Sequence, residues 1–146
     1  LERIRLVAQK VIDRCEPLQA VSIDQGPPGA ESAFWFMVFR LDLGKVSCDL
    51  DAFVDALRAE GLPFNAHYTT PFIQHPWFKN RAVFGNSGYP WTCPLFTGDP
   101  NRRYELPNWK ANNSSLFLIK IHEGMTLHEA EDIAEALAKV EAAFLK

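Results

Sequence analysis

The chain has 146 residues, of which 47% are hydrophobic and 23% are charged, and these proportions are typical of a folded globular domain rather than a disordered chain. Its formal net charge is -3, so we do not expect nucleic acid, whose phosphate backbone attracts basic proteins, to be its main partner. No apolar run approaches the roughly 20 residues of a membrane-spanning helix, so we expect no membrane partner either.

Two features bear on the origin of the chain. Its three cysteines, Cys15, Cys48 and Cys93, lie far apart and form no paired motif. That distribution is typical of a reducing compartment, so we expect a cytoplasmic protein. The chain starts at Leu1 without an initiator Met and enters a helical pattern at once. We therefore expect it to be a piece of a longer protein.

The first third of the chain contains three predicted elements. Apolar residues at helical spacing predict a helix over residues 1–15, which Pro17 ends. The stretch 25–32 is rich in Gly and Pro and predicts a turn or an exposed loop. The continuous apolar run 33–41 has the length of a strand, and such a run predicts a central strand covered on both faces.

A second helix is predicted over residues 48–60. Ser47 is its predicted N-cap, and Gly61 is placed to end it in the left-handed conformation. A short extended piece begins at Leu62 and Phe64. The predicted buried stripe of the helix is Leu50, Phe53, Val54 and Leu57.

Residues 68–112 show no sustained period, because six prolines interrupt them, yet they hold ten aromatic residues. Long loops in compact domains are usually functional or disordered, and the aromatic content argues against disorder. We expect short helical turns at 70–73 and 76–79. Beyond them, 79–112 is predicted to be an irregular, aromatic and Pro-rich segment that lies on another surface.

The last third predicts a strand and a closing helix. Residues 115–121 form the second apolar strand. Thr126 and Glu129 have the spacing of a capping box, and the helix that follows runs to about Phe144. The whole pattern predicts one α+β domain over residues 1–146, with a small, largely antiparallel sheet covered by helices.

Few residues form a recognisable chemical motif. The chain has no Gly-rich phosphate loop and no hydrolase or zinc signature. The spacing of its four histidines fits no common ligand pattern, so we expect no metal site. Cys93 has no His near it in the sequence and is predicted to be an inert buried thiol, although a small enzyme that uses Cys93 or the histidines is a third reading of the chain.

Two pairs of neighbouring residues have both a functional and a structural interpretation. Arg102 and Arg103 have the chemistry to clamp a phosphate, or they are simply solvated. His67 and Tyr68 lie at the start of the irregular segment, where ligand-contacting residues concentrate. Their alternative role is structural, with a Tyr that packs and a His that bonds the backbone.

Several passages, taken in order, resemble the C-terminal small domain of the DegT/DnrJ/StrS family of pyridoxal-phosphate (PLP) aminotransferases, which are fold-type I enzymes. The resemblance starts in the strand Phe36-Met37-Val38-Phe39-Arg40-Leu41-Asp42 and in the passage from Asp51 to Phe64, which ends Ala59-Glu60-Gly61-Leu62-Pro63-Phe64. It continues in Tyr68, in the passage from Pro71 to Phe78, and in Cys93-Pro94. It closes with Leu116-Phe117-Leu118-Ile119-Lys120-Ile121-His122-Glu123-Gly124-Met125-Thr126.

The resemblance implies that most of the enzyme lies outside this chain. An N-terminal large domain would bind PLP and supply the Schiff-base lysine, since none of the seven lysines here lies in the family's lysine motif. We therefore expect no catalytic, cofactor-binding or metal-binding residue in this chain. His67 and Tyr68 fall where some members place a pair near a small-molecule substrate, and they are the predicted substrate-binding residues. The full-length enzyme is expected to be a homodimer.

The resemblance predicts the substrate-closing domain of an aminotransferase that acts on a keto-sugar or a related cyclic ketone. The fragment alone should not transaminate. The alternative is a free-standing α+β module that binds a ligand or regulates another protein without catalysis. A severed enzyme domain should expose apolar surface and bind a dye such as ANS, whereas a regulatory module should be stable and respond to a small ligand.

Overall fold

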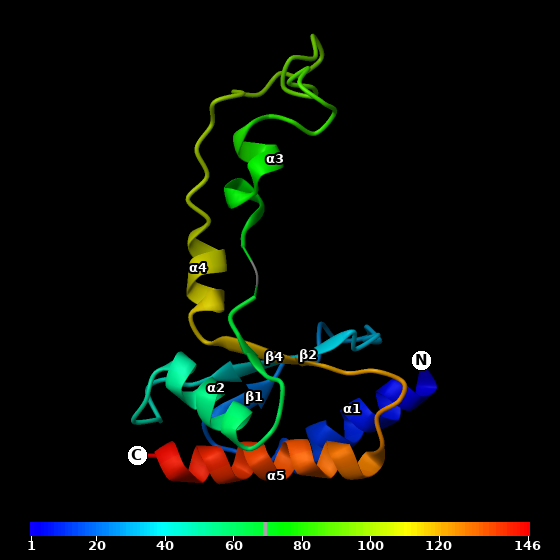
Figure 1. Ribbon diagram of the computed structural model, residues 1–146, viewed down its shortest axis with the longest axis vertical. Helices are drawn as coiled ribbons and strands as arrows, with labels where there is room; N and C mark the ends of the chain where they lie inside the picture. The colour runs from blue at the N-terminus through cyan, green and yellow to red at the C-terminus, as the bar shows by residue number, and fades with distance from the viewer. Residues whose placement is uncertain (69) are drawn as a thin grey trace. The chain divides into compact units, whose positions relative to one another are not determined.

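The computed structural model describes residues 1–68 and 70–146, which form five α-helices, one 3-10 turn and four strands (Figure 1). In chain order these are α1 (Glu2–Cys15), β1 (Val21–Ile23), β2 (Phe36–Leu41), α2 (Leu50–Ala59), β3 (Asn65–Ala66), η1 (Phe72–Gln74), α3 (Pro76–Lys79), α4 (Pro107–Asn113), β4 (Leu116–Lys120) and α5 (Leu127–Phe144). No helix among the described residues is long and apolar enough to cross a membrane.

The contacts within the chain divide it into two compact units. Unit 1 consists of residues 1–68 and 112–146, and it contains all four strands together with α1, α2 and α5. Unit 2 consists of the described residues of the segment Thr69–Ala111, including η1 and α3. The single domain expected over residues 1–146 stays a prediction.

The sheet of unit 1 has the strand order β1-β2-β4-β3, and every pairing is antiparallel. Its two long strands, β2 and β4, lie side by side at the centre, with Phe39 opposite Phe117. The two short strands add one edge each, Val21 opposite Leu41 and Ala66 opposite Phe117. The predicted α+β fold with a small antiparallel sheet is confirmed.

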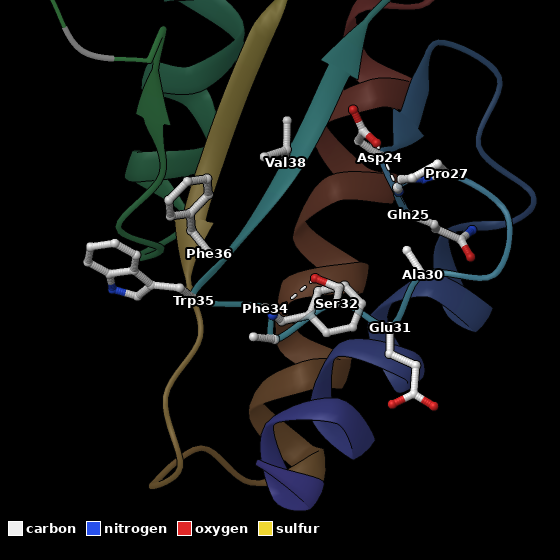
Figure 2. Close-up of a pocket in the computed structure, with 12 residues that line it drawn as sticks. Asp24, Gln25, Pro27, Ala30, Glu31, Ser32, Phe34, Trp35, Phe36 and Val38 are labelled. Carbon is white, nitrogen blue, oxygen red and sulfur yellow. Dashed lines mark hydrogen bonds between the residues drawn. The ribbon is translucent and has the colours of Figure 1, made fainter.

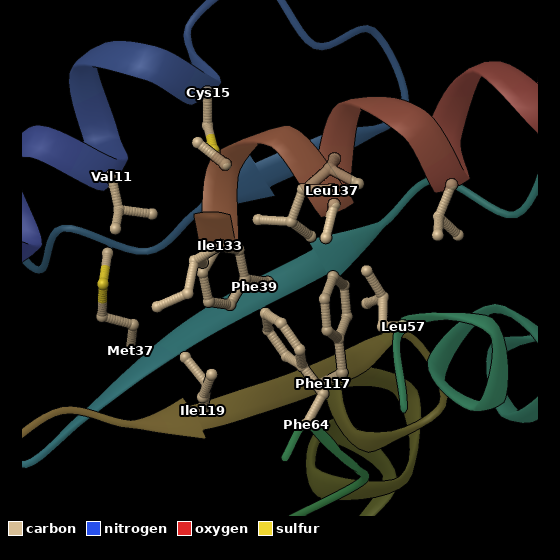
Figure 3. Packing of buried hydrophobic residues seen from close by; sticks show 14 of the residues in the cluster. Val11, Cys15, Met37, Phe39, Leu57, Phe64, Phe117, Ile119, Ile133 and Leu137 are labelled. Atoms are coloured by element: carbon tan, nitrogen blue, oxygen red, sulfur yellow. The ribbon is translucent and has the colours of Figure 1, made fainter. Parts of the chain in front are cut away.

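The hydrophobic core lies between the sheet and the helices α1, α2 and α5 (Figure 3). Phe117 is fully buried at its centre, with ring centroids 5.2 Å from Phe39, 5.7 Å from Phe53 and 5.6 Å from Phe64. The helical stripes predicted from the sequence supply the other side of this core, because Phe53 and Leu57 of α2 and Leu137 of α5 are buried there.

The prediction that the apolar run 33–41 is covered on both faces is wrong. The strand begins only at Phe36, and its residues alternate between half-buried and buried. Met37, Phe39 and Leu41 point into the core, whereas Phe36, Val38 and Arg40 lie on the opposite face. The run is continuously apolar for another reason, which is that Phe36 and Val38 line a surface pocket.

The N-cap of α2 is Asp49 and not Ser47. The Asp49 carboxylate accepts a hydrogen bond from the Ala52 backbone N–H at 2.8 Å. Ser47 lies too early to reach the helix, and its hydroxyl donates to the Phe144 carbonyl at 3.0 Å. At the other end of the helix, Gly61 has a φ of 91°, so the predicted left-handed ending is confirmed.

Three side chains fix the two ends of α5. The predicted capping box is confirmed, because the Thr126 hydroxyl accepts from the Glu129 N–H at 3.2 Å and the Glu129 carboxylate accepts from the Thr126 N–H at 2.7 Å. Near the other end of the helix, the buried Glu141 carboxylate accepts three backbone N–H groups at 2.7–2.8 Å, from residues 19–21. Glu141 therefore ties α5 to the start of β1.

Unit 2 is organised around Phe78 of α3. The ring of Phe78 contacts Phe72 at 4.9 Å, Trp91 at 5.6 Å and Tyr104 at 6.0 Å between centroids. The two short turns expected at 70–73 and 76–79 correspond to η1 and α3. The helix α4, which begins at Pro107 in unit 2 and ends at Asn113 in unit 1, was not predicted.

Candidate functional site

One face of the unit 1 sheet points away from α1, α2 and α5, and we call it the open face. The register of the strands places on it the side chains that alternate with the core residues. They are Ser22, Phe36, Val38, Arg40, Asn65, Leu116, Leu118 and Lys120. Both predicted site residues follow β3 directly, so they lie at the border of this face.

His67 is held by two backbone carbonyls, one at its own main-chain N–H and one at a ring nitrogen. Its φ of 61° is a left-handed value, which His adopts more readily than most residues. Its backbone N–H donates to the Leu116 carbonyl at 2.8 Å, and ring Nδ1 lies 2.7 Å from the Asn113 carbonyl. Because a carbonyl only accepts, Nδ1 carries the proton. The other ring nitrogen, Nε2, lies 3.5 Å from a carboxylate oxygen of Asp51.

Tyr68 is anchored by the same neighbour as His67. Its backbone N–H donates to the Asn113 side-chain oxygen at 2.6 Å. Asn113 thus binds the His67 ring through its carbonyl and the Tyr68 backbone through its side chain. Asn113 was not predicted as a site residue, because it is 45 residues away from Tyr68 along the chain and contacts the pair only through the fold.

The aromatic ring of Tyr68 reaches across the open face. Its centroid lies 5.4 Å from that of Phe36, at the start of β2, although β4 separates β2 from β3. Leu118 of β4, which the strand register places on the same face, is only 7% exposed. Trp35 extends the aromatic row, since it lies 6.0 Å from Phe36 and is 75% exposed. Neither Trp35 nor Phe36 was predicted as a site residue.

A polar row crosses the open face beside these rings. The Arg40 guanidinium donates to the Asp24 carboxylate at 3.2 Å and to the Asn112 side-chain oxygen at 3.1 Å. All three residues are partly or fully exposed. Arg40 is therefore oriented by two acceptors, and its charge is balanced by one carboxylate.

A pocket of about 440 Å³ lies next to the aromatic row, between β2 and the segment that joins β1 to β2 (Figure 2). Phe36 and Trp35 belong both to this pocket and to the aromatic row. Phe34, Pro27 and Val38 add to its apolar wall, and Asp24 and Glu31 bring carboxylates to it. The pocket has the volume of a small-molecule site and a largely apolar lining.

The rim of the pocket is fixed by α1. Arg5 pairs with the Glu31 carboxylate at 2.8 Å and donates to the Ser32 carbonyl at 3.2 Å. No Lys, Arg or His is among the described residues that line the pocket. Its chemistry is that of aromatic and aliphatic faces with carboxylate acceptors, which suits a neutral ring that carries hydroxyl donors.

The remaining candidates form no second site of this kind in unit 1. Burial raises the pKa of the Cys15 thiol to about 12, and the nearby Glu141 carboxylate adds to the effect, so this thiol is not a nucleophile at neutral pH. Cys93, in unit 2, is half-buried within a turn. Within residues 1–68 and 70–146, no three His, Cys, Asp or Glu side chains are grouped to hold a metal ion.

No protein-family model matches this sequence, and no curated protein matches it. Solved structures do match its fold. A protein from Streptococcus pneumoniae, assigned as a sugar aminotransferase and solved in its PMP form, has a TM-score of 0.65 at 15% identity. A DegT DnrJ EryC1 StrS aminotransferase from Brucella abortus has a TM-score of 0.61 at 17% identity. A GDP-4-keto-6-deoxymannose-3-dehydratase with a trapped PLP-glutamate geminal diamine has a TM-score of 0.58 at 15% identity.

These matches cover nearly all of this chain but a minor part of the others. They cover 97%, 94% and 93% of the chain, and 31%, 30% and 30% of the three solved chains. At identities this low the likeness is one of fold. The chain therefore has the fold of a segment, about a third of the full length, of sugar aminotransferases and a related PLP-dependent dehydratase.

Proposed function

We propose that this chain is the C-terminal, substrate-closing domain of a PLP-dependent aminotransferase that acts on a keto-sugar or a related cyclic ketone. The observation that carries the proposal is the match of 97% of this chain to 31% of a sugar aminotransferase with a TM-score of 0.65. The passages that resemble the DegT/DnrJ/StrS family in sequence lead to the same enzyme class independently of the fold.

The chemistry of the open face supports a substrate of this class. A sugar ring has apolar C–H faces and hydroxyl donors at its edge. Phe36 and Trp35 offer aromatic faces on which the C–H faces of the sugar can pack. The carboxylates of Asp24 and Glu31 are acceptors for its hydroxyl groups. His67 and Tyr68 lie at the border of the same face, and we propose that they contact the substrate.

The residues of this chain do not fit the cofactor itself. A Schiff-base lysine needs a desolvated pocket in which its amine loses its proton. Lys10, Lys45 and Lys139 form surface ion pairs with carboxylates at 2.6–3.6 Å. The other four lysines, at positions 79, 110, 120 and 146, are exposed. We therefore assign the binding of PLP, and the proton transfers at the lysine, to a large domain that precedes this chain in the parent protein.

The role that remains for this chain is to bind, orient and enclose. Binding of a substrate ring against Phe36 would place apolar surface over it and exclude water from the reaction. The contacts of Asn113 hold the ring of His67 and the backbone of Tyr68 before the substrate arrives, which lowers the entropy lost on binding. A cytoplasmic homodimer of the full-length enzyme is part of the same proposal.

Substitution of His67 in the parent protein tests the proposed site. We expect His67→Ala to lower kcat/KM for amination of a keto-sugar about tenfold, since that is the effect of losing one good hydrogen bond in the transition state. His128→Ala is the matched control, because His128 is exposed on α5 and should leave kcat/KM unchanged. Equal kinetics of the His67 variant and wild type would remove His67 from the site.

The isolated chain tests the domain assignment. Residues 1–146 with added PLP, glutamate and a keto-sugar should show no transamination, whereas the parent protein should be active. Turnover by the isolated chain would contradict the proposal. Saturable binding of a regulatory ligand by a protein that lacks any preceding domain would favour the free-standing module instead.

A further inference from the structure

Unit 2 contains another pocket, and the side chains that line it carry a strong positive charge. Its volume is about 520 Å³, and it lies between α3 and the segment 101–104. Four of its eight lining residues are cationic, namely Lys79, Arg81, Arg102 and Arg103, and none is acidic. The volume lies within the range of small-molecule sites. The pocket is built entirely from unit 2, so its geometry is independent of unit 1.

The charge is local to this unit. Residues 70–111 contain five Lys or Arg and two Asp or Glu, which gives +3, whereas the whole chain carries -3. One of the two acids is already engaged, since the Asp99 carboxylate accepts from the Asn101 N–H at 2.8 Å. Among the described residues, no carboxylate lies within ion-pair distance of Lys79, Arg102 or Arg103. These three cations are thus available to an anion from outside the chain.

Arg81 has a structural role in the pocket, because its guanidinium is already bound to groups of the protein. Its guanidinium lies between two aromatic rings, 4.6 Å from the centroid of Phe78 and 4.5 Å from that of Trp91. It also donates to the carbonyls of Phe78 and Pro100. These contacts tie α3 to the segment that carries Arg102 and Arg103. Arg81 therefore connects α3, which contains Lys79, to Pro100, which lies just before Arg102 and Arg103 in the chain.

The floor of the pocket is aromatic. Phe78 and Tyr104 line it, and their rings contact each other at 6.0 Å. The Arg102 guanidinium lies over the Tyr104 ring at 5.2 Å, which restricts the side chain that carries it. An aromatic floor displaces water, and charge interactions are stronger where water is displaced. The same floor offers an apolar surface to the organic part of a ligand.

We propose that this pocket binds the phosphate group of a small phosphorylated molecule through Lys79, Arg102 and Arg103, with the organic part of the ligand against Tyr104. Guanidinium groups match the geometry of phosphate oxygens with paired hydrogen bonds, and a lysine adds a point charge. Several converging cations without a carboxylate exclude a cationic or neutral ligand as the preferred partner. Neither the pocket nor its occupant depends on PLP or on transamination.

Titration of the isotopically labelled chain, followed by NMR at low ionic strength, tests the proposal with two probes, inorganic phosphate and glucose 1-phosphate. We expect saturable binding of both, tighter for the ester, with shifts in the signals of residues 79 and 102–104. Arg103→Gln should weaken binding of both probes about tenfold, because one charge-assisted hydrogen-bonded contact is lost. Tyr104→Leu should weaken binding of the ester more than binding of inorganic phosphate, because it removes the surface for the organic part as well as the ring under Arg102.

Lys110→Gln is the charge-matched control. Lys110 belongs to the same unit and carries the same charge, but it does not line the pocket, so its variant should bind within twofold of wild type. Equal weakening by Arg103→Gln and Lys110→Gln would overturn the site and leave only diffuse attraction to a basic segment. Absence of saturable binding to the wild-type chain would overturn it as well. Equal affinity for the two probes would overturn the assignment of an ester. Unchanged spectra of the free variants show that each remains folded.

Discussion

Glu141 is the only charged residue that is buried among the described residues, at 5% exposed. A buried carboxylate is costly unless hydrogen bonds compensate for the lost water. Here one oxygen accepts from the Gln19 N–H at 2.7 Å, and the other accepts from the N–H groups of Ala20 and Val21, each at 2.8 Å. The carboxylate in turn satisfies backbone donors that have no strand partner at this point. The buried carboxylate and the three backbone N–H groups therefore each supply the hydrogen-bond partner that the other lacks.

Replacement of Glu141 should destabilise unit 1. Glu141→Ala leaves three backbone donors without an acceptor, and we expect the free energy of unfolding to fall by about 3 kcal/mol. Glu141→Gln keeps one acceptor oxygen and should cost roughly half as much. Urea denaturation followed by circular dichroism measures both. Loss of less than about 0.5 kcal/mol in the Ala variant would show that water replaces the carboxylate.

The three thiols should differ in reactivity. Burial and, to a smaller extent, the Glu141 carboxylate raise the pKa of Cys15 to about 12, against the opposite effect of Arg14. At pH 8 the thiolate fraction of Cys15 is then about a thousandfold below that of a thiol with a pKa of 9. Alkylation with iodoacetamide, followed by mass spectrometry, should leave Cys15 unmodified in the folded chain and modify it in denaturant. Equal rates in both states would contradict the buried position.

At the residue scale, the sequence suggested where a site begins but not what completes it. His67 and Tyr68 stand out because a polar and an aromatic residue follow a short extended piece. Their partner Asn113 and the stacked ring of Phe36 are separated from them by many residues, and only the pairing of β4 with both neighbouring strands brings them together. The structural and the substrate-binding interpretations of His67 are compatible, since its Nδ1 bonds the Asn113 backbone carbonyl and leaves Nε2 for another partner.

The capping box is the clearest case at the scale of an element. The backbone N–H of Thr126 donates to Glu129, and the side chain of Thr126 binds it as well, and both hydrogen bonds lower the pKa of the Glu129 carboxyl. A lowered pKa means that Glu129 stabilises the folded state above the unfolded pKa of 4.5, and that this stabilisation is lost as the pH falls through the lower folded value.

Thr126→Ala should therefore show a pH-dependent effect on stability. At pH 7 we expect the variant to be less stable by about 1 kcal/mol, the usual cost of losing an N-cap side chain. The difference from wild type should shrink as the pH falls through the lowered pKa of Glu129 in the folded state, because Glu129 is protonated in both proteins below that value. Thr126→Ser keeps the cap and should follow wild type. Thermal unfolding at several pH values checks this, and a constant difference would contradict it.

Elements with a strong period were predictable, and elements defined by their neighbours were not. The stripe of α2 and the capping box of α5 act within one helix, so the local sequence contains them. β1 and β3 have three and two residues, too few for a two-residue period to be visible. They are strands because Leu41 and Phe117 lie opposite them in longer strands. The predicted N-cap, Ser47, is two residues before the true N-cap, Asp49, because the predicted helix starts at residue 48 and the observed one at Leu50.

At the scale of the whole molecule, unit 1 holds the complete core. Every residue of the buried hydrophobic cluster lies in residues 1–68 or 112–146. The chain leaves this unit after Tyr68 and returns at Asn112, and the Tyr68 N–H lies 2.6 Å from the Asn113 side chain. The two ends of the intervening segment are thus next to each other on unit 1.

Removal of unit 2 should leave unit 1 folded. A chain in which residues 69–111 are replaced by a short Gly-Ser linker should keep a cooperative thermal transition and the strand and helix signals of circular dichroism, because no core residue is lost. A companion chain with Phe117→Ala in the same background should unfold at a much lower denaturant concentration, because its free energy of unfolding falls by about 3–5 kcal/mol. Loss of the cooperative transition in the linker chain itself would show that unit 2 is needed for the fold.

The contacts at the end of α5 determine when unit 1 can be completed during synthesis. Glu141 binds backbone that the ribosome releases 120 residues earlier, at Val21. Leu145 then pairs with Val46, and the Lys146 N–H donates to the Lys45 carbonyl at 3.0 Å. Domains generally fold as units while the chain emerges. Unit 1 can therefore be completed only after the last turn of α5 has left the exit tunnel, because the backbone at residues 19–21 has no carboxylate to bind before then.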